Sequence, residues 1–161
     1  MCIRDRIAYL SGGMEYAQNE GADWRIVMKD WLKEHLSHEV IDPVMESNKL
    51  VGHYDAEDYR DWEKTNPGKF KEFFRLLIQQ DLRAVMGQSD YLIVLWDKGV
   101  LKGRVTHGDV TMSYWVAKPL FLVYTLSEED LSAWISSCFT ETFASFDELK
   151  ADLLKRYKKT K

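Results

Sequence analysis

Two aspartates are candidates for chemistry, one because it conflicts with its helix and the other because it lies in the loop after a predicted strand, where a helix should begin. Asp81 lies toward the carboxyl end of an apolar helical pattern, where helix propensity and the helix dipole both disfavour an acid. Asp109 follows Thr106 at the expected start of another helix. A carboxyl group can act as an acid, a base or a nucleophile, and a conflict with local context points to function. A solvated Asp81, and an Asp109 that only complements the helix dipole behind a Thr106 cap, are the structural alternatives.

A small-residue loop and an arginine are candidates for ligand binding. Ser11, Gly12 and Gly13 follow a short apolar run, and two glycines let backbone N–H groups approach an anion or a sugar hydroxyl. Their spacing matches neither common glycine-rich phosphate motif, so a plain strand-to-helix turn is an alternative. Arg25, near a helix start, could hold a phosphate or a carboxylate through two parallel hydrogen bonds. A surface arginine beside the core residue Trp24 is the other interpretation.

The sequence indicates neither a metal site nor a catalytic triad. His107 has no metal-ligand cluster around it, and the pattern contains no Ser-His-Asp arrangement. Cys2 and Cys138 lie far apart in the sequence. We therefore expect neither a metal site nor a disulfide framework, and we predict the reducing cytoplasm as the location.

Composition predicts one soluble globular domain over residues 1–161, with 45% hydrophobic and 30% charged residues. The net charge of −4 argues against nucleic acid as a partner. No apolar run approaches the roughly 18 residues of a membrane span, so no membrane partner is expected. The charged opening, MCIRDR, does not join the pattern of the first strand, and we expect residues 1–6 to be a disordered leader.

The elements that would position these candidates alternate between strand and helix patterns, which is typical of an α/β fold with a mostly parallel sheet. In such sheets ligands bind beyond the carboxyl ends of the strands. Chemistry is therefore expected in the segments 11–24, 43–66, 97–109 and 124–127. Strands are expected at 7–10, 39–43, 91–96 and 119–124, with an edge strand at 137–140, and helices at 23–36, 68–86, 107–117, 127–135 and 145–158. The stretch 44–66 is expected to be a long polar connection, and Ser145 is expected to cap the last helix.

Several motifs in order resemble the nucleoside 2-deoxyribosyltransferase-like family. The stretches are IAYLSGGM followed by WR, then IDP, then QDLRAVMGQSDYLIVLWD, and then THGDVTMSYWVAKPLFLV. Together they span about residues 7–124, and Asp109 stands nine positions before Lys118, as the catalytic acid of the family does before the Lys of its Lys-Pro pair. The resemblance implies a single flavodoxin-like, Rossmann-like domain with helices on both sides of the sheet.

The resemblance also implies an activity, the cleavage or transfer of the N-glycosidic bond of (deoxy)nucleosides. The nucleobase would be exchanged through a covalent glycosyl-carboxylate intermediate. Asp109 would be the nucleophile, and Asp81 would orient the base or support its protonation. The implied substrate-binding residues are Tyr9, Ser11, Gly12, Gly13, Arg25, Asp97 and Thr106, with Asp97 directed to the sugar hydroxyls.

Two departures from the family pattern keep other functions open. The family has Glu at the position of Asp109, and Gly103 to Thr106 separates the usual Gly-Thr pair. A shift of the reacting oxygen by about 1 Å can cost ~100-fold in rate. The chain could therefore be a non-catalytic nucleotide-binding domain.

The choice between transfer and hydrolysis also stays open. A nucleoside 5′-monophosphate N-glycosidase would need an anion clamp, for which Ser11, Gly12, Arg25 and Arg104 are candidates. Tyr9 and the aromatic stretch 54–66 would instead stack a base and exclude water, which favours transfer. The expected ligands are a nucleoside or nucleotide and a free nucleobase, without a cofactor, in a homo-oligomer.

Overall fold

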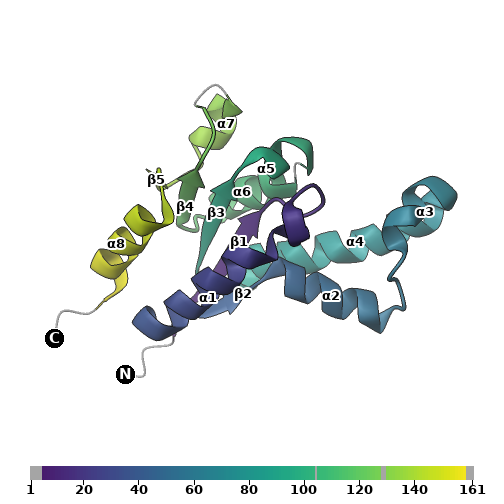
Figure 1. The fold of residues 1–161 in the computed structure, drawn as a ribbon, viewed down its shortest axis with the longest axis horizontal. Helices are drawn as coiled ribbons and strands as arrows, with labels where there is room; N and C mark the ends of the chain where they lie inside the picture. The colour runs from purple at the N-terminus through teal and green to yellow at the C-terminus, as the bar shows by residue number, and fades with distance from the viewer. Residues whose placement is uncertain (1–4, 104, 128–129, 159–161) are drawn as a thin grey trace.

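The centre of the molecule is a parallel sheet of five strands in the order β2-β1-β3-β4-β5 (Figure 1). The computed structural model describes residues 5–103, 105–127 and 130–158. The strands are β1 (Ile7–Gly12), β2 (Glu39–Ile41), β3 (Tyr91–Trp96), β4 (Leu120–Tyr124) and β5 (Glu141–Phe143). The chain reverses its direction of strand addition between β1 and β3, where Gly12 lies opposite Leu95. Ligand sites of such sheets form beside this point, at the carboxyl ends of the strands.

Helices cover both faces of the sheet. The helices are α1 (Ala22–Leu36), α2 (Pro43–His53), α3 (Tyr59–Thr65), α4 (Pro67–Arg83), α5 (Lys98–Gly103), α6 (Val105–Trp115), α7 (Ala133–Ser136) and α8 (Phe146–Tyr157). On one face, Leu10 and Ile93 pack with α1 and α8, while on the other, Tyr9 and Val94 pack with α5, α6 and the π-helical turn Ala84–Gln88 that follows α4. β3 is buried along its whole length, as its continuous apolar sequence predicts.

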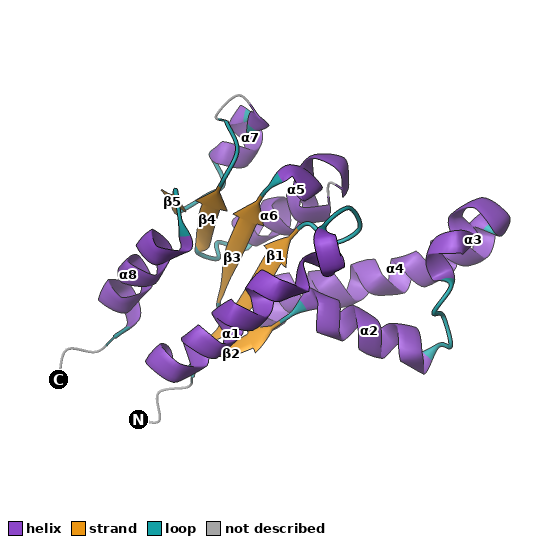
Figure 2. Ribbon diagram, in the orientation of Figure 1, coloured by secondary structure: helices purple, strands orange, loops and turns teal. Residues whose placement is uncertain are grey.

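A helical arm extends from this α/β body, and it corrects one prediction. Segment 44–66 is not a long loop, because α2 and α3 occupy most of it and pack against α4 away from the sheet (Figure 2). Asp42 caps α2 by accepting a hydrogen bond from Val44 N at 2.9 Å, with Pro43 in the first turn. A separate apolar cluster holds the arm together, built from Ala56, Tyr59, Trp62, Phe73 and Leu77.

Other boundaries shift by a few residues. The loop expected at 97–105 contains α5, and the edge strand lies at 141–143 rather than at 137–140. Ser145 does cap α8, since its Oγ accepts from Glu148 N at 3.2 Å, as predicted. Arg6 is already tied to the fold, because its carbonyl oxygen accepts from Glu39 N at 2.9 Å. The expected leader 1–6 is therefore too long at its carboxyl end, and residues 1–4 lie outside the described residues. None of the helices in the described ranges has the length and apolar character needed to cross a membrane.

Candidate functional site

A cleft of about 640 Å³ lies between the carboxyl edge of the sheet and the helical arm. Three of the four segments that the sequence singled out meet there: the loop after β1, the α2–α3 segment, and the stretch from α5 to α6. The lining residues are Gly12, Gly13, Met14, Glu15, Ser47, Tyr59, Arg60, Phe74, Leu77, Ile78, Asp81, Gly99, Val100, Gly103, Val105 and Thr106.

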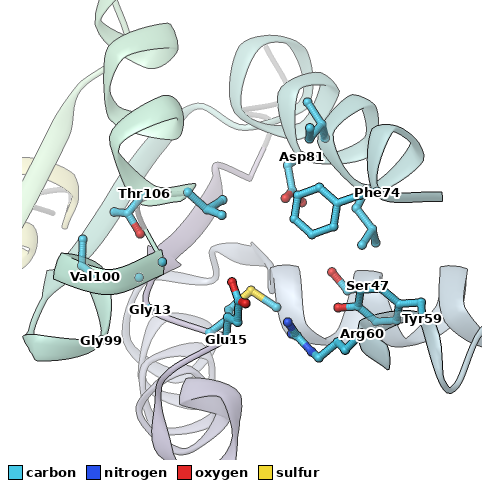
Figure 3. A pocket seen from close by; sticks show the side chains of 16 residues that line it. Gly13, Glu15, Ser47, Tyr59, Arg60, Phe74, Asp81, Gly99, Val100 and Thr106 are labelled. Atoms are coloured by element: carbon cyan, nitrogen blue, oxygen red, sulfur yellow. The ribbon is translucent and has the colours of Figure 1, made fainter. Parts of the chain in front are cut away.

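One face of α4 forms a wall of the cleft. Phe74, Leu77, Ile78 and Asp81 line it, and their spacing of three and four residues places them on one side of a helix. Figure 3 shows Asp81 extending from α4 toward the cleft, with Thr106 on one side and Tyr59 on another. The isolated acid in an apolar helix is therefore directed at the cleft and not at bulk solvent. An apolar wall that ends in a single carboxyl group suits a flat ligand with one polar edge.

Asp109 lies just behind the wall of the cleft, in contact with Ser11. The Ser11 hydroxyl donates to Asp109 Oδ2 at 2.7 Å, and only 6% of Asp109 is exposed. α6 begins at Val105, so Asp109 stands past the first helical turn and does not cap the helix. Burial raises the pKa of Asp109 to about 6, although the Ser11 hydrogen bond and the positive charge of Arg25 oppose that rise.

Asp81 occupies a similarly dry setting next to Tyr9. Burial and the negative charge of Asp109 raise the pKa of Asp81 to about 7, while a hydrogen bond from Tyr9 and the charge of Arg25 act in the opposite direction. Burial, with the charges of Asp109 and Asp81, also raises the pKa of Tyr9 well above its usual value. The Tyr9 phenol therefore keeps its proton and acts as a donor to Asp81. Tyr9 is 1% exposed and lines a neighbouring hollow with Asp81 and Ala84 rather than this cleft.

The two carboxyl groups form an electrostatically coupled pair with different proton affinities. Burial and the charge of Asp109 both raise the pKa of Asp81, so a proton at this site is favoured on Asp81 while Asp109 is favoured as the carboxylate. One buried carboxylate beside one carboxylic acid is the arrangement in which a nucleophile and a proton donor work together on a glycosidic bond. Asp81 can therefore exchange a proton with a ligand in the cleft, whereas Asp109 lies behind the cleft wall.

The small-residue loop contributes backbone to the cleft. Gly12 and Gly13 line it, and Gly13 passes so close to Gly99 that a Cβ atom there would lie 3.0 Å from the Gly99 carbonyl carbon. Only glycine permits this approach of the loop after β1 to the start of α5. Thr106 lines the opposite side and is 2% exposed. Of the predicted binding residues, Gly12, Gly13 and Thr106 thus line this cleft, whereas Ser11 and Tyr9 do not.

Arg25 differs from the anion clamp that the sequence suggested. Its side chain is 0% exposed, Nε donates to Leu10 O at 3.0 Å, and Nη2 donates to Gly12 O at 3.0 Å. Nη1 is also engaged with backbone carbonyl groups of the loop after β1. All three guanidinium nitrogens therefore have backbone partners. An arginine at a helix start faces either a ligand or its own loop, and the sequence cannot distinguish the two.

Asp97 does not line the cleft. Asp97 Oδ1 accepts from Gly99 N at 2.9 Å, and the residue lines a second hollow with Trp24 and Thr125. Its carboxylate organises the turn into α5, because an aspartate that follows a strand readily accepts from the backbone two residues on. Arg104 lies outside the described residues.

The arm supplies cleft residues that the sequence analysis did not identify. Ser47, Tyr59 and Arg60 line the cleft opposite the sheet edge (Figure 3). Arg60 Nη2 pairs with Glu20 at 2.8 Å, and its guanidinium lies 5.1 Å from the centre of the Tyr59 ring. The expectation of an aromatic segment near the ligand pointed to this region, but its helical structure was missed, and with it the face that lines the cleft. Within the described ranges, His, Cys, Asp and Glu form no cluster of three or more that could hold a metal ion.

Comparison with solved structures confirms the predicted α/β, flavodoxin-like fold. A 2-deoxyribosyltransferase from the psychrotolerant bacterium Bacillus psychrosaccharolyticus, presented as a biocatalyst for the synthesis of antiviral and antitumoral nucleosides, matches with a TM-score of 0.61 and 16% sequence identity. The match covers 89% of this chain and 90% of that chain. At this identity the likeness establishes the fold. No protein-family model and no curated protein matches the sequence.

Proposed function

We propose that the protein transfers glycosyl groups between nucleobases, acting on (deoxy)nucleosides through a covalent intermediate on Asp109. The observation that carries this proposal is a pair of interacting carboxyl groups. Asp109 accepts a hydrogen bond from Ser11, and Asp81, whose pKa the charge of Asp109 raises, is directed into the cleft. The shared fold with a 2-deoxyribosyltransferase supports the same class of reaction. The apolar wall of α4 suits a planar base, and the backbone of Gly12 and Gly13 suits sugar hydroxyls.

The proposed reaction balances with these groups alone. A carboxylate oxygen of Asp109 forms a bond to the anomeric carbon, while the bond from that carbon to the base nitrogen breaks and its electron pair leaves with the base. Asp81 gives its proton to the departing base. A second base then attacks the anomeric carbon and loses its proton to Asp81, which regenerates the Asp109 carboxylate. Water in place of the second base gives hydrolysis.

The burial of Asp109 supports a second candidate, a nucleotide-binding domain without turnover. Asp109 lines none of the hollows described above, and its carboxyl group stands on a shorter arm than the Glu of the resembled family. Attack on a sugar in the cleft requires the wall between Gly12 and Thr106 to open. Hydrolysis of 5′-monophosphates has less support, because Arg25 is committed to backbone carbonyls and Arg60 is paired with Glu20.

A base-exchange assay separates these functions. The protein is incubated with deoxynucleosides or their 5′-monophosphates, with and without free adenine, and the products are separated by HPLC. We expect a new deoxynucleoside only where adenine is added, and no exchange by an Asp109→Ala variant that retains its fold. Base release from monophosphates alone would establish the hydrolase. Saturable binding without product in any mixture would establish the binding domain.

The proposed ligands are one nucleoside and one free base, which occupy the cleft in turn. A homo-oligomer, which the family resemblance implies, stays a prediction. Light scattering coupled to size-exclusion chromatography tests it directly, because it measures the molar mass of the eluting protein. A monomer would give 18.9 kDa, and an oligomer would give a multiple of that mass.

A further inference from the structure

Arg25 ties together a loop that is otherwise strained. Its Nη1 donates to the carbonyl oxygens of Gly21, Glu20 and Gly13 at 2.8, 3.2 and 3.5 Å. Asn19 and Glu20 have φ angles of 49° and 51°, and Gly21 has a φ of 72°, so three consecutive residues are left-handed. That conformation costs a residue other than glycine about 1–2 kcal/mol. Two of the carbonyl groups that Arg25 holds, those of Glu20 and Gly21, belong to the strained segment, so these hydrogen bonds offset part of the strain.

The same guanidinium connects this loop to the arm. Arg25 Nε lies 3.9 Å from Asp42 Oδ1, and both side chains are buried. Asp42 caps α2, the helix whose Ser47 lines the cleft. A buried charge is tolerated only when it is paired and hydrogen-bonded. A substitution of Arg25 that keeps only some of these interactions should therefore be poorly tolerated.

The consequence for the site falls on Ser11. Arg25 holds the carbonyl groups of Leu10 and Gly12, the residues on either side of Ser11. With both flanking peptides fixed, the Ser11 hydroxyl is held 2.7 Å from Asp109 Oδ2. The positive charge of Arg25 also lowers the pKa of Asp109 against the effect of burial.

We propose that Arg25 is a positioning residue for the reaction, which holds Ser11 against Asp109 by gripping the backbone on both sides of it and supplies the charge that favours the Asp109 carboxylate. This inference rests on the proposed function, in which Asp109 is the nucleophile. It assigns Arg25 to geometry and electrostatics behind the cleft, where it would act through Ser11 and Asp109 without touching the substrate.

Two substitutions separate the geometric part from the electrostatic part. Arg25→Lys keeps the charge, but one ammonium group cannot grip carbonyls in several directions as a guanidinium does. We expect kcat to fall by about 10–100-fold, with a smaller change in KM and an unchanged midpoint of the acidic limb of kcat/KM. Arg25→Gln also removes the charge, so that midpoint should move to higher pH.

The acidic limb must be assigned to Asp109. The groups that face Asp109 are Tyr9 and Ser11 on β1, Arg25 on α1 and Asp81 on α4, and His107 lies two residues before it on α6. Since the pKa of Asp81 is raised into the same pH range, the carboxyl ¹³C resonance of Asp109 is titrated by NMR in each variant. The Asp109→Asn spectrum identifies that resonance.

Matched controls exclude a general loss of stability. Arg156→Lys and Arg156→Gln alter an arginine on α8 that pairs with Glu141 and Asp152. Both should leave kcat and the acidic and alkaline limbs of the pH profile unchanged. Asp42→Asn removes the carboxylate partner of Arg25 but leaves its carbonyl contacts, so kcat should stay within about threefold of wild type. If Arg25→Gln does not fold, Arg25→Lys and Asp42→Asn still provide the test.

The inference is overturned if Arg25→Lys retains the wild-type kcat, or if the Asp109 midpoint in a folded Arg25→Gln protein equals that of wild type. Failure of the proposed function looks different. A wild-type protein that exchanges no base removes the reaction, whereas the NMR titration of Asp109 still reports whether Arg25 controls its ionisation.

Discussion

Asp109 is buried and Asp81 is partly buried at the cleft wall, and their immediate partners differ. Asp109 accepts a hydrogen bond from the Ser11 hydroxyl, whereas Asp81 lies beside Tyr9 and next to the negative charge of Asp109. The proton therefore resides preferentially on Asp81, since its pKa of about 7 lies above the value of about 6 for Asp109. Paired titratable groups whose environments separate their pKa values assign the roles of acid and nucleophile.

A narrow pH optimum follows from these roles. Catalysis needs an ionised Asp109 and a protonated Asp81, so kcat/KM should fall below about pH 6 and again above about pH 7. The profile of base exchange measured between about pH 4 and 9 checks this expectation. In Asp81→Asn the alkaline limb should disappear together with most of the activity. An activity that is flat across neutral pH would contradict the assignment.

The same burial predicts that Asp81 destabilises the fold at neutral pH. Its pKa is raised from 3.8 to about 7, so the folded state binds the proton more tightly than the unfolded state. That stabilising contribution is complete below the unfolded pKa and is lost as the pH rises through about 7. Asp81→Asn should therefore raise the free energy of unfolding at pH 8 by on the order of 1 kcal/mol. In a protein of this size that gain corresponds to a rise in Tm of about 2–4 °C.

At pH 4 the Asp81→Asn gain should vanish, because both proteins are then uncharged at this position. Asp30→Asn, at an exposed position of α1, is the matched control and should change Tm at neither pH. An Asp81→Asn gain of equal size at both pH values would show that the charge is not its cause.

At the scale of elements, the loop after β1 depends on Gly21. A Cβ atom at Gly21 would lie 2.5 Å from Gly13 O, and its φ of 72° disfavours any other residue. Gly21→Ala should therefore cost about 1–3 kcal/mol in the free energy of unfolding. Gly52→Ala in α2 is the matched control, since a Cβ there meets nothing within 4 Å and should stabilise the helix by about 0.5–1 kcal/mol. Urea unfolding of both variants measures the difference, and equal effects would contradict the account of the loop.

The wall of α4 makes a second prediction at this scale. Ile78 lines the cleft and is 45% exposed, so Ile78→Ala should weaken nucleoside binding by roughly 1 kcal/mol and raise KM about fivefold with little change in kcat. Ile26→Ala on α1, where the side chain is 52% exposed, is the matched control and should leave KM unchanged. A KM that does not respond to Ile78→Ala would place the base elsewhere in the cleft.

Most elements of the α/β body could be predicted because they carry local signals, whereas the short elements α5 and β5 were missed or displaced. β3 is a continuous apolar run, and Ser145 with Glu148 announces the start of α8. The arm gave no such signal, since Tyr59 and Trp62 alternate with acidic residues and bury themselves only against Phe73 of α4. The structure of segment 44–66 depends on contacts with α4, which lies outside it. A pattern of residues within 44–66 alone therefore cannot predict that structure.

The same limit explains the mixed outcome for the candidate site. The conflict of Asp81 with its helix was visible in the sequence, and the structure directs it into the cleft. The direction of Arg25 was not visible, because two of the carbonyl groups that it holds, those of Glu20 and Gly21, belong to a left-handed turn that propensity does not predict. The contact of Ser11 with Asp109 joins residues 98 positions apart, which only the parallel sheet brings together.

At the scale of the whole molecule, the cleft lies between two separately packed bodies, the α/β core and the helical arm. A nucleoside bound there contacts both, so binding should stabilise the arm together with the core. At a concentration of about 100 times Kd, a ligand that binds only the folded state adds about 2.7 kcal/mol. Thermal unfolding with a saturating deoxynucleoside should give one transition at higher Tm. Two transitions, with only one of them shifted, would show that the ligand does not bridge the bodies.

The central claim is that Asp109 forms a bond to the sugar, and the most direct measurement is the mass of the protein quenched with acid during turnover of a deoxynucleoside in the absence of an acceptor base. We predict an adduct with the mass of one deoxyribosyl group on the peptide that contains Asp109, lost on addition of adenine and absent from Asp109→Asn. An adduct on another residue, or base exchange that continues undiminished in Asp109→Asn, would contradict the account.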